Sequence, residues 1–324
     1  MTAEKTAVLP LSPDEAFALV TEPARLRRWQ TVSARVDLRA GGSYRWTVVP
    51  GHAAAGTFRE VVPGERIVFG WGWEGSDDLA PDSSTVTITL EPVADGTLVR
   101  LVHDGLTPDQ EASHMEGWNH FFDRLERAAA AGDAGPDEWA AAPATLDKLT
   151  SADATLAVLQ HVLRDLTPED LERQTPCTDF TVRKLVDHLV DSMKGLGAMA
   201  DGVVEVADEG PVESRVADAA QQALEAWNRR GLEGTVKVGP NEMPADIAAN
   251  ILSLEFLIHA WDVAVATGRQ VVVSDEVTGY VLELAEQVIT PQAREGGAFA
   301  PEVEVGPDAH LLDRLIAYSG RAAV

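Results

Sequence analysis

The sequence is poor in cysteine and in basic residues, and both shortages restrict what the protein can be. Cys177 is the only cysteine among 324 residues, so no internal disulfide can form, and a reducing cytoplasm is the expected compartment. The 26 basic residues are outnumbered by 52 acidic ones, and the resulting net charge of −26 repels phosphate backbones and anionic lipid surfaces. We therefore expect no nucleic-acid partner and no membrane partner.

Long apolar runs are also lacking. No uninterrupted apolar segment approaches the roughly 18 residues of a membrane-spanning helix. The N-terminal stretch MTAEKTAVLPLSPDE has neither the basic nor the apolar region of a signal peptide, so none is predicted. What is present is ordinary for a globular protein, with 45% hydrophobic and 24% charged residues. A chain of this length exceeds what one hydrophobic core usually serves, which predicts two domains.

A segment rich in Ala, Gly, Pro and Asp separates two regions of different patterning. AAAAGDAGPDEWAAAPAT has no sustained apolar period, and we place a linker at residues 133–145 within it. Residues 1–132 are assigned to a first domain and residues 146–324 to a second. The first domain is rich in strand-like runs and the second is almost entirely helical, so the expected fold class is α+β.

The first domain combines strand-like runs with helix signals. It opens with a short strand-like run, TAVLPL. Ser12 and Glu15 then have capping-box spacing and Pro13 takes the first helical position, which predicts a helix there. The strand-like runs that follow are SYRWTVV, AAGTFREVV, RIVFGWGW, STVTITLEPV and GTLVRLVHDG. A helix over about 109–130 then carries an apolar stripe. These patterns predict a curved antiparallel sheet with one long helix laid across it.

This order of elements resembles the START-like (SRPBCC) helix-grip superfamily, and within it the branch of Hsp90-ATPase-activator homologues (AHSA1-like). The segments that carry the resemblance are LSPDEAFALVTEPARLRRW at 11–29, GTFREVVPGERIVFGW at 56–71, STVTITLEPVADGTLVRLVHDGL at 84–106 and EGWNHFFDRLE at 116–126. The resemblance covers about residues 5–130 and implies an apolar cavity for a small molecule between sheet and helix. The residues that could line it are Trp46, Trp71, Trp73 and Trp118. Taken singly, such tryptophans more often serve as core packing.

The second domain is predicted to be a compact bundle of mainly antiparallel helices. The expected helices span about 151–166, 181–200, 213–230, 244–267 and 275–289. In the fourth of them, LEFLIHAWDVAVATG sets three ionisable residues into an otherwise apolar segment. At about 100° per residue, Glu255, His259 and Asp262 fall on one stripe about 60° wide.

A buried, unpaired carboxylate is costly, so this stripe must face water, a cationic side chain or a metal ion. A strip so narrow, without Lys or Arg, makes a poor solvated face. For an ion pair, the candidate partners are Arg183, Arg229 and Arg294. For a metal, Glu255 and His259 are spaced i, i+4 and can reach one point beside the helix. His188, at the edge of the apolar face of its own helix, could supply a third ligand.

Two imidazoles and one carboxylate, with water completing the shell, are a catalytic type of coordination. Asp262 could orient the His259 imidazole or hold an outer-shell water. A lone histidine in a helix is more often a satisfied core residue, but the joint arrangement favours a metal. His161 lies opposite the apolar stripe of its helix and is expected to be solvated. Cys177 has no histidine nearby in sequence and is expected to be a small buried residue at the start of a helix.

Three blocks of the second domain resemble the actinobacterial metal-binding family of mycothiol-dependent maleylpyruvate isomerase type, which belongs to the DinB-like four-helix-bundle superfamily. They are TPCTDFTVRKLVDHLV at 175–190, LEFLIHAWDVAVATG at 254–268 and the tail FAPEVEVGPDAHLLDRLIAYSGR. The resemblance covers essentially residues 146–324. It implies His188, Glu255 and His259 as ligands of a divalent ion, with zinc first and nickel, cobalt, manganese or iron as alternatives. It also implies mycothiol as a co-substrate.

Two functions are compatible with these features. The first is a metal-dependent thiol transferase or cis–trans isomerase, acting on a small apolar molecule captured by the first domain. The second is a non-catalytic protein that binds or sequesters a small molecule, with a structural or ligand-assisting metal. A co-chaperone role would follow only from the relatives of the first domain, and likeness of fold is weak support for it. The sequence assigns no catalytic residue beyond the ligands and leaves the oligomeric state open.

Overall fold

In the computed structural model, the chain divides into two units, Met1–Asp137 and Glu138–Val324. The structure describes residues 1–177, 179–239, 241–297, 299–306 and 308–322. The first unit combines a sheet with helices and the second is mainly helical, so the predicted α+β fold class is confirmed. The division falls inside the segment assigned to the linker, where the short helix α4 (Glu138–Ala141) begins the second unit.

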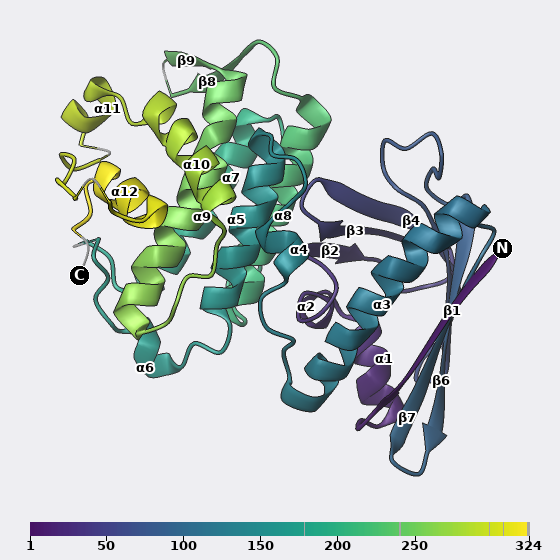
Figure 1. Cartoon of the computed structure of the whole chain (residues 1–324). Helices are drawn as coiled ribbons and strands as arrows, with labels where there is room; N and C mark the ends of the chain where they lie inside the picture. Colours follow the sequence, from purple (N-terminus) through teal and green to yellow (C-terminus); the bar gives the residue numbers. More distant parts are fainter. Residues whose placement is uncertain (178, 240, 298, 307, 323–324) are drawn as a thin grey trace. The chain divides into compact units, whose positions relative to one another are not determined.

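The first unit is one antiparallel sheet with a long helix along it (Figure 1). The strands, in chain order, are β1 (Thr2–Leu9), β2 (Ser33–Val36), β3 (Ser43–Val49), β4 (His52–Val62), β5 (Arg66–Trp71), β6 (Ser84–Val93) and β7 (Gly96–Asp104). They lie in the order β1-β7-β6-β5-β4-β3-β2. The helices are α1 (Pro13–Thr21), α2 (Pro23–Leu26) and α3 (Pro108–Ala131), of which α3 packs against β1. The predicted strands are confirmed, and β2 is an additional one.

Local sequence explains these elements. Ser12 and Glu15 form the predicted capping box at the start of α1, and Thr107 forms a second one at the start of α3. In β6, Val86 and Ile88 are buried while the threonines between them are half-exposed, which is the alternation of a strand with one face on the core. The sheet therefore presents its apolar face to α3.

Four helices of the second unit lie side by side as a bundle (Figure 1). They are α5 (Lys148–Leu163), α7 (Val182–Met199), α8 (Val212–Arg230) and α9 (Ala245–Thr267). Two further helices, α10 (Asp275–Val288) and α12 (Leu311–Tyr318), pack on each other, and α10 also packs on α9. The remaining elements are α6 (Pro168–Leu171), α11 (Pro291–Glu295) and a hairpin of β8 (Thr235–Val238) and β9 (Asn241–Pro244). The five predicted helices are confirmed, whereas the hairpin was not predicted.

Helix α9 is the central element of the bundle. By length and composition alone it could cross a membrane, but 83% of its most apolar 18-residue stretch is buried inside the protein. It contacts α5, α7 and α10, which is the position of a core helix. It ends at Gly268, whose φ of 72° is the left-handed conformation common at helix C-caps. The ionisable stripe therefore lies inside the bundle.

Candidate metal centre

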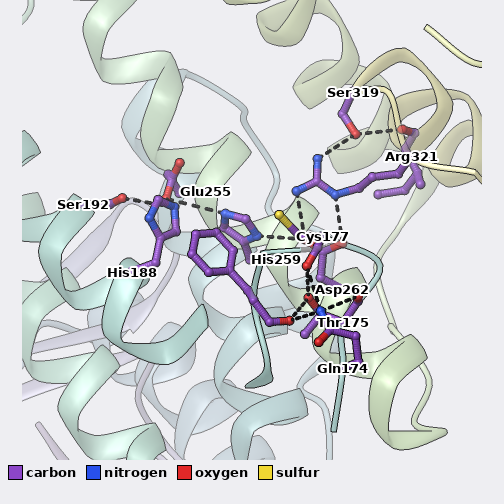
Figure 2. A network of polar contacts seen from close by, with 12 residues as sticks. Gln174, Thr175, Cys177, His188, Ser192, Glu255, His259, Asp262, Ser319 and Arg321 are labelled. Carbon is purple, nitrogen blue, oxygen red and sulfur yellow. Dashed lines mark hydrogen bonds and ion pairs between the residues drawn. The ribbon is translucent and has the colours of Figure 1, made fainter. Parts of the chain in front are cut away.

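Two imidazoles and a carboxylate converge between α7 and α9 (Figure 2). Glu255 Oε2 lies 3.3 Å from His188 Nε2 and 3.8 Å from His259 Nε2. One ligand atom of each residue lies within 4.8 Å of the other two. Ligand atoms bonded at about 2 Å to one ion lie roughly 3–4 Å apart, so small adjustments would bring these three around a cation. The structure thus brings together the three ligands predicted from the sequence.

The Glu255 carboxylate is the group that most needs a cation. Its Oε2 atom is buried and accepts no hydrogen bond of good geometry within the described part of the chain. Burial would raise the pKa of this carboxyl, but the neighbouring imidazoles, His188 first, hold the pKa below its usual value. A buried carboxylate oxygen with no hydrogen bond is unfavourable by itself. The donor set therefore fits a divalent ion.

His188 is the exposed side of the centre. Contact with Glu255 raises the pKa of its imidazole despite partial burial. The Phe180 ring stacks on it at 5.0 Å and 24°, and Ser192 Oγ lies 3.4 Å from its Nε2. Its side chain is 34% exposed, against 8% for His259. A small molecule from solvent would therefore reach the centre on the His188 side.

His259 is held from behind by a buried ion pair. Its Nδ1 lies 2.8 Å from Asp262 Oδ2, and the Asp262 carboxylate is fully buried. Arg321 donates to both carboxylate oxygens, from Nε at 2.8 Å and from Nη2 at 2.9 Å. Burial would raise the pKa of Asp262, but the hydrogen bonds from His259 and Arg321 hold it below its usual value. The Nδ1 proton of His259 therefore faces Asp262, and its Nε2 lone pair is left for the centre.

The arginine that pairs with this stripe differs from those suggested by the sequence. Arg183 pairs with Glu172 at 2.7 Å, and Arg294 donates to the backbone carbonyl of Tyr318 at 2.7 Å. Arg229 is exposed on α8. The cationic partner is instead Arg321, and it neutralises only Asp262. Both imidazoles and Glu255 are left to the candidate metal centre.

Cys177 and His161 differ from their predicted burial. Cys177 is half-buried rather than fully buried, and it lies beside Asp262 and Arg321 (Figure 2). Burial raises the pKa of its thiol more than the Arg321 charge lowers it, so the thiol is protonated. His161 is half-buried on α5 rather than solvated. Neither belongs to the metal-type cluster, which within the described ranges is His188, Glu255 and His259 alone.

In the first unit, the four tryptophans predicted to line a cavity form one aromatic cluster. The Trp71 ring lies 6.2 Å from Trp46, 5.4 Å from Trp73 and 5.3 Å from Trp118. Trp73 is half-buried and the other three are buried. Trp46 Nε1 is buried without a hydrogen-bond partner in the described residues, so it is a donor that a water or a ligand acceptor would satisfy. A groove of about 640 Å³ on this unit is lined by none of these tryptophans. Its lining consists of Pro13, Asp14, residues 63–66 and residues 89–92.

Comparison with known proteins agrees with this division. Residues 10–130 match the family described as Activator of Hsp90 ATPase homolog 1-like protein, and residues 152–264 match the Mycothiol maleylpyruvate isomerase N-terminal domain. The uncharacterized protein Rv0738 of Mycobacterium tuberculosis is 30% identical over 172 residues, which are 52% of this chain and 92% of that protein.

Two solved structures are similar to part of the chain. The AHSA1-like protein of Rhizobium etli is 40% identical, over 45% of this chain and 91% of its own length, with a TM-score of 0.37. DynU16, from the dynemicin biosynthetic locus, is 24% identical over 41% of this chain, with a TM-score of 0.38. This chain spans about half (48%) of DynU16.

Fold and sequence together define a two-domain class of protein, in which a START-like helix-grip domain precedes a helical bundle. The chain therefore carries an AHSA1-like domain over residues 10–130, followed by a domain of the mycothiol maleylpyruvate isomerase N-terminal type over residues 152–264.

Proposed function

We propose that the protein is a divalent-metal-dependent thiol transferase, or a thiol-assisted cis–trans isomerase, which uses mycothiol and acts on a small apolar molecule held by the first domain. Zinc is the first candidate for the metal, and nickel, cobalt, manganese and iron suit the same ligands. The match of the second domain supports mycothiol chemistry. The single cysteine supports a reducing cytoplasm as the compartment.

One observation carries this proposal. Glu255 Oε2 is buried, lacks a hydrogen bond in the described residues, and lies within 4 Å of two imidazole Nε2 atoms. In a site of this composition, a bound divalent ion lowers the pKa of a coordinated thiol or water and polarises carbonyl groups. His188, Glu255 and His259 would hold that ion.

Other residues of the chain prepare the site for a small thiol. Asp262 keeps the proton of His259 on Nδ1, which leaves Nε2 as a lone-pair donor. The Phe180 ring shields one face of His188, and Ser192 places a hydroxyl 3.4 Å from the His188 Nε2 atom that faces Glu255. The site is therefore enclosed at His259 and accessible at His188.

The two reactions differ in what happens to the thiol. In transfer, the S–H bond breaks and an S–C bond forms. Either the electrophile loses a π bond, and the proton passes to the other atom of that bond, or a leaving group departs with its bonding electrons and the proton passes to water. In isomerisation, the thiol adds to a carbon–carbon double bond and is expelled again after rotation about the resulting single bond. The second reaction regenerates the thiol, so thiol consumption distinguishes the two.

Metal analysis combined with a thiol assay tests the proposal. We expect about one equivalent of metal in the full-length wild type and little in His188→Ala or His259→Ala, because each removes a ligand. His161→Ala is the matched control, since this histidine lies outside the cluster. The metal-loaded protein is then incubated with mycothiol and a panel of small electrophiles and cis-alkenes, and products are identified by mass spectrometry. If the loaded wild type neither transfers the thiol nor isomerises any compound, the catalytic proposal is wrong.

A non-catalytic binding protein is the second candidate, with a metal that is structural or assists the ligand. It is favoured by the first unit, where the described residues include no metal-type cluster but do include the unpartnered Trp46 N–H. Native mass spectrometry of the purified chain tests this candidate. A ligand bound at about one equivalent and released unchanged, lost in Trp46→Phe, would support binding over turnover.

A further inference from the structure

We propose that Arg321 is a positioning residue for the metal centre, through which the C-terminal helix α12 fixes the His259 imidazole by way of Asp262. This inference rests on the proposed function, because it concerns a ligand of the same centre. Arg321 lies 59 positions after Asp262 in the chain and on a different element, so the centre would be completed only when the C-terminal segment has folded onto α9.

The backbone at the end of α12 is built to direct this arginine. The helix ends in a Schellman motif: Arg321 N–H donates to Ile316 O at 3.1 Å and Gly320 N–H to Ala317 O at 3.0 Å. Gly320 has a φ of 87°, and a Cβ atom there would lie 2.6 Å from Ala300 O. Only glycine fits both the conformation and the space. The turn therefore reverses the chain at a defined residue.

The residue after that glycine departs from the usual pattern of such a cap. An apolar side chain at this position commonly packs back onto the end of its own helix. Here the position is Arg321, and its side chain extends to Asp262 on α9 instead (Figure 2). Ser319 Oγ accepts a further hydrogen bond from Nη1 at 3.3 Å. All three guanidinium nitrogens are thus engaged, which fixes the plane of the group.

The pair is placed so that it can act on His259. Asp262 is 0% exposed and the Arg321 side chain only 13%, so solvent screens their attraction little. Arg321 engages both carboxylate oxygens, and a two-point contact of this kind sets the orientation of the carboxylate as well as its charge. Oδ2, which faces His259 Nδ1, is one of the two oxygens it holds. The guanidinium thereby determines where the Nδ1 proton is held.

Removal of Arg321 should therefore act on the imidazole. Asp262 would remain buried with His259 as its other partner, and its carboxylate would be free to turn. The preference for a proton on Nδ1 would weaken, and the Nε2 lone pair needed by a metal would be present for less of the time. Changes to the groups behind a metal-bound histidine typically reduce metal affinity by about 10–100-fold. Because Arg321 acts one residue further away, we expect about tenfold.

The experiment compares Arg321→Met and Arg321→Lys with the wild type, in the full chain. The first measurement is a long-range ¹H–¹⁵N spectrum of the metal-free protein at alkaline pH, with the His259 ring assigned through His259→Gln. We expect the Nδ1–H tautomer in the wild type, a mixture in Arg321→Met, and an intermediate result in Arg321→Lys, which keeps the charge without the two-point contact. The second measurement is zinc affinity by competition with a chelator, where Arg321→Met should bind about tenfold more weakly.

Arg294→Met is the matched control. Arg294 also anchors the end of α12, through the Tyr318 carbonyl, but it makes no contact with Asp262. It should keep the wild-type tautomer and zinc affinity even if α12 becomes less stable. An unchanged tautomer in Arg321→Met, or equal losses in Arg321→Met and Arg294→Met, would overturn the inference. If the wild type binds neither zinc nor nickel, cobalt, manganese or iron, the proposed function fails, while the tautomer spectrum still decides the role of Arg321.

Discussion

Each unit of this protein contains a pair of imidazoles packed edge to face, at nearly the same spacing. The His103 and His114 rings of the first unit lie 4.9 Å apart at 84°. The His188 and His259 rings of the second lie 5.2 Å apart at 86°. Ring geometry alone therefore does not distinguish the two pairs. The difference lies in what the nitrogen atoms contact.

In the first unit, every nitrogen of the pair has a protein partner. Trp118 Nε1 donates to His103 Nδ1 at 3.3 Å, so the His103 proton lies on Nε2, which donates to Ser84 Oγ at 2.9 Å. Trp71 Nε1 donates to His114 Nε2 at 3.2 Å, and Nδ1 of that ring donates to a carbonyl of its own helix at 2.7 Å. Burial lowers the pKa of both imidazoles, that of His103 to about 3. Both rings are therefore neutral, and the protein itself satisfies their nitrogens.

In the second unit, two Nε2 atoms converge on one carboxylate oxygen that lacks a hydrogen bond in the described residues. A buried polar cluster whose groups are all satisfied specifies and stabilises a core. A cluster that leaves a buried carboxylate oxygen unsatisfied between two imidazole nitrogens is suited to bind an ion or ligand from outside the chain. Unsatisfied hydrogen-bonding atoms, and not the proximity of histidines, therefore identify the candidate metal centre.

The largest expected effect comes from removing one imidazole from each pair and measuring zinc affinity. His259→Ala removes a ligand, and zinc affinity should fall by more than the roughly 100-fold that an outer group costs. His114→Ala removes an equally placed imidazole of the first unit and should leave zinc affinity unchanged. Competition titration with a chelator measures both. A loss of zinc in His114→Ala would mean that the comparison assigns the wrong pair.

The next effect is on stability. With free zinc at about 100 times its dissociation constant, binding should add about 2.7 kcal/mol to the free energy of unfolding. Hydrogen exchange followed by mass spectrometry should show this protection in peptides of α7 and α9, and not in peptides of the first unit. Glu255→Gln, which keeps the size of the side chain and removes its charge, should abolish the protection. Equal protection across both units would indicate non-specific zinc binding.

A pH titration should separate the pairs in another way. The pKa of His103 in the folded protein, about 3, lies below its usual value of 6.5. Between these pH values the unfolded chain binds a proton that the folded chain does not. Stability is therefore complete above about pH 6.5 and falls as the pH decreases, by up to about 1.4 kcal/mol per pH unit. Urea denaturation of the wild type and of His103→Gln at a series of pH values measures this contribution as the difference in slope.

The matched control is His52→Gln, since His52 is an exposed histidine of the same unit. It should reproduce the slope of the wild type, because this exposed side chain makes none of the buried contacts of His103. Parallel curves for the wild type and His103→Gln would show that this imidazole is not held neutral, and the contrast between the pairs would weaken.

The contrast also shows what could be predicted from sequence. The alternation of buried and half-exposed residues in β6 and the i, i+4 spacing of Glu255 and His259 are local signals, and both led to the correct elements. β2, with four residues, is too short to show a period, and β8 and β9, also of four residues each, form a short hairpin between two long helices. The proximity of His188 to Glu255 and His259 on α9 could be predicted, because a residue at the edge of the apolar face of α7 points toward a neighbouring helix.

Arg321 could not be predicted in this way. Its partner lies 59 positions earlier, and the pairing depends on how α12 and its cap pack in the second unit. The arginines considered instead make other contacts, Arg183 with Glu172 and Arg294 with backbone carbonyls. The only local signal is the glycine that ends α12, followed by an arginine where an apolar residue is common. That signal marks a departure from a pattern without naming the partner.

The smallest expected effect comes from the serine beside each pair. Ser84 is 3% exposed, and its hydroxyl accepts from His103 at 2.9 Å and donates to the Trp71 carbonyl at 2.9 Å. Ser84→Ala leaves the buried His103 N–H without its partner, removes one hydrogen bond from the Trp71 carbonyl, and should cost about 1–3 kcal/mol. Ser192 is half-buried, and its hydroxyl lies 3.4 Å from His188 Nε2. Water can replace it, so Ser192→Ala should change stability by no more than about 0.5 kcal/mol.

Urea denaturation of the two serine variants near neutral pH gives the difference directly. We expect Ser84→Ala to lose more free energy of unfolding than Ser192→Ala. The Ser84 hydroxyl is a buried hydrogen-bond partner of His103, whereas the Ser192 hydroxyl lies at the half-exposed edge of the candidate metal centre. Equal costs would mean that Ser192 satisfies His188 as fully as Ser84 satisfies His103. The His188 nitrogen would then be committed to the protein, and the candidate metal centre would lose one of its three ligands.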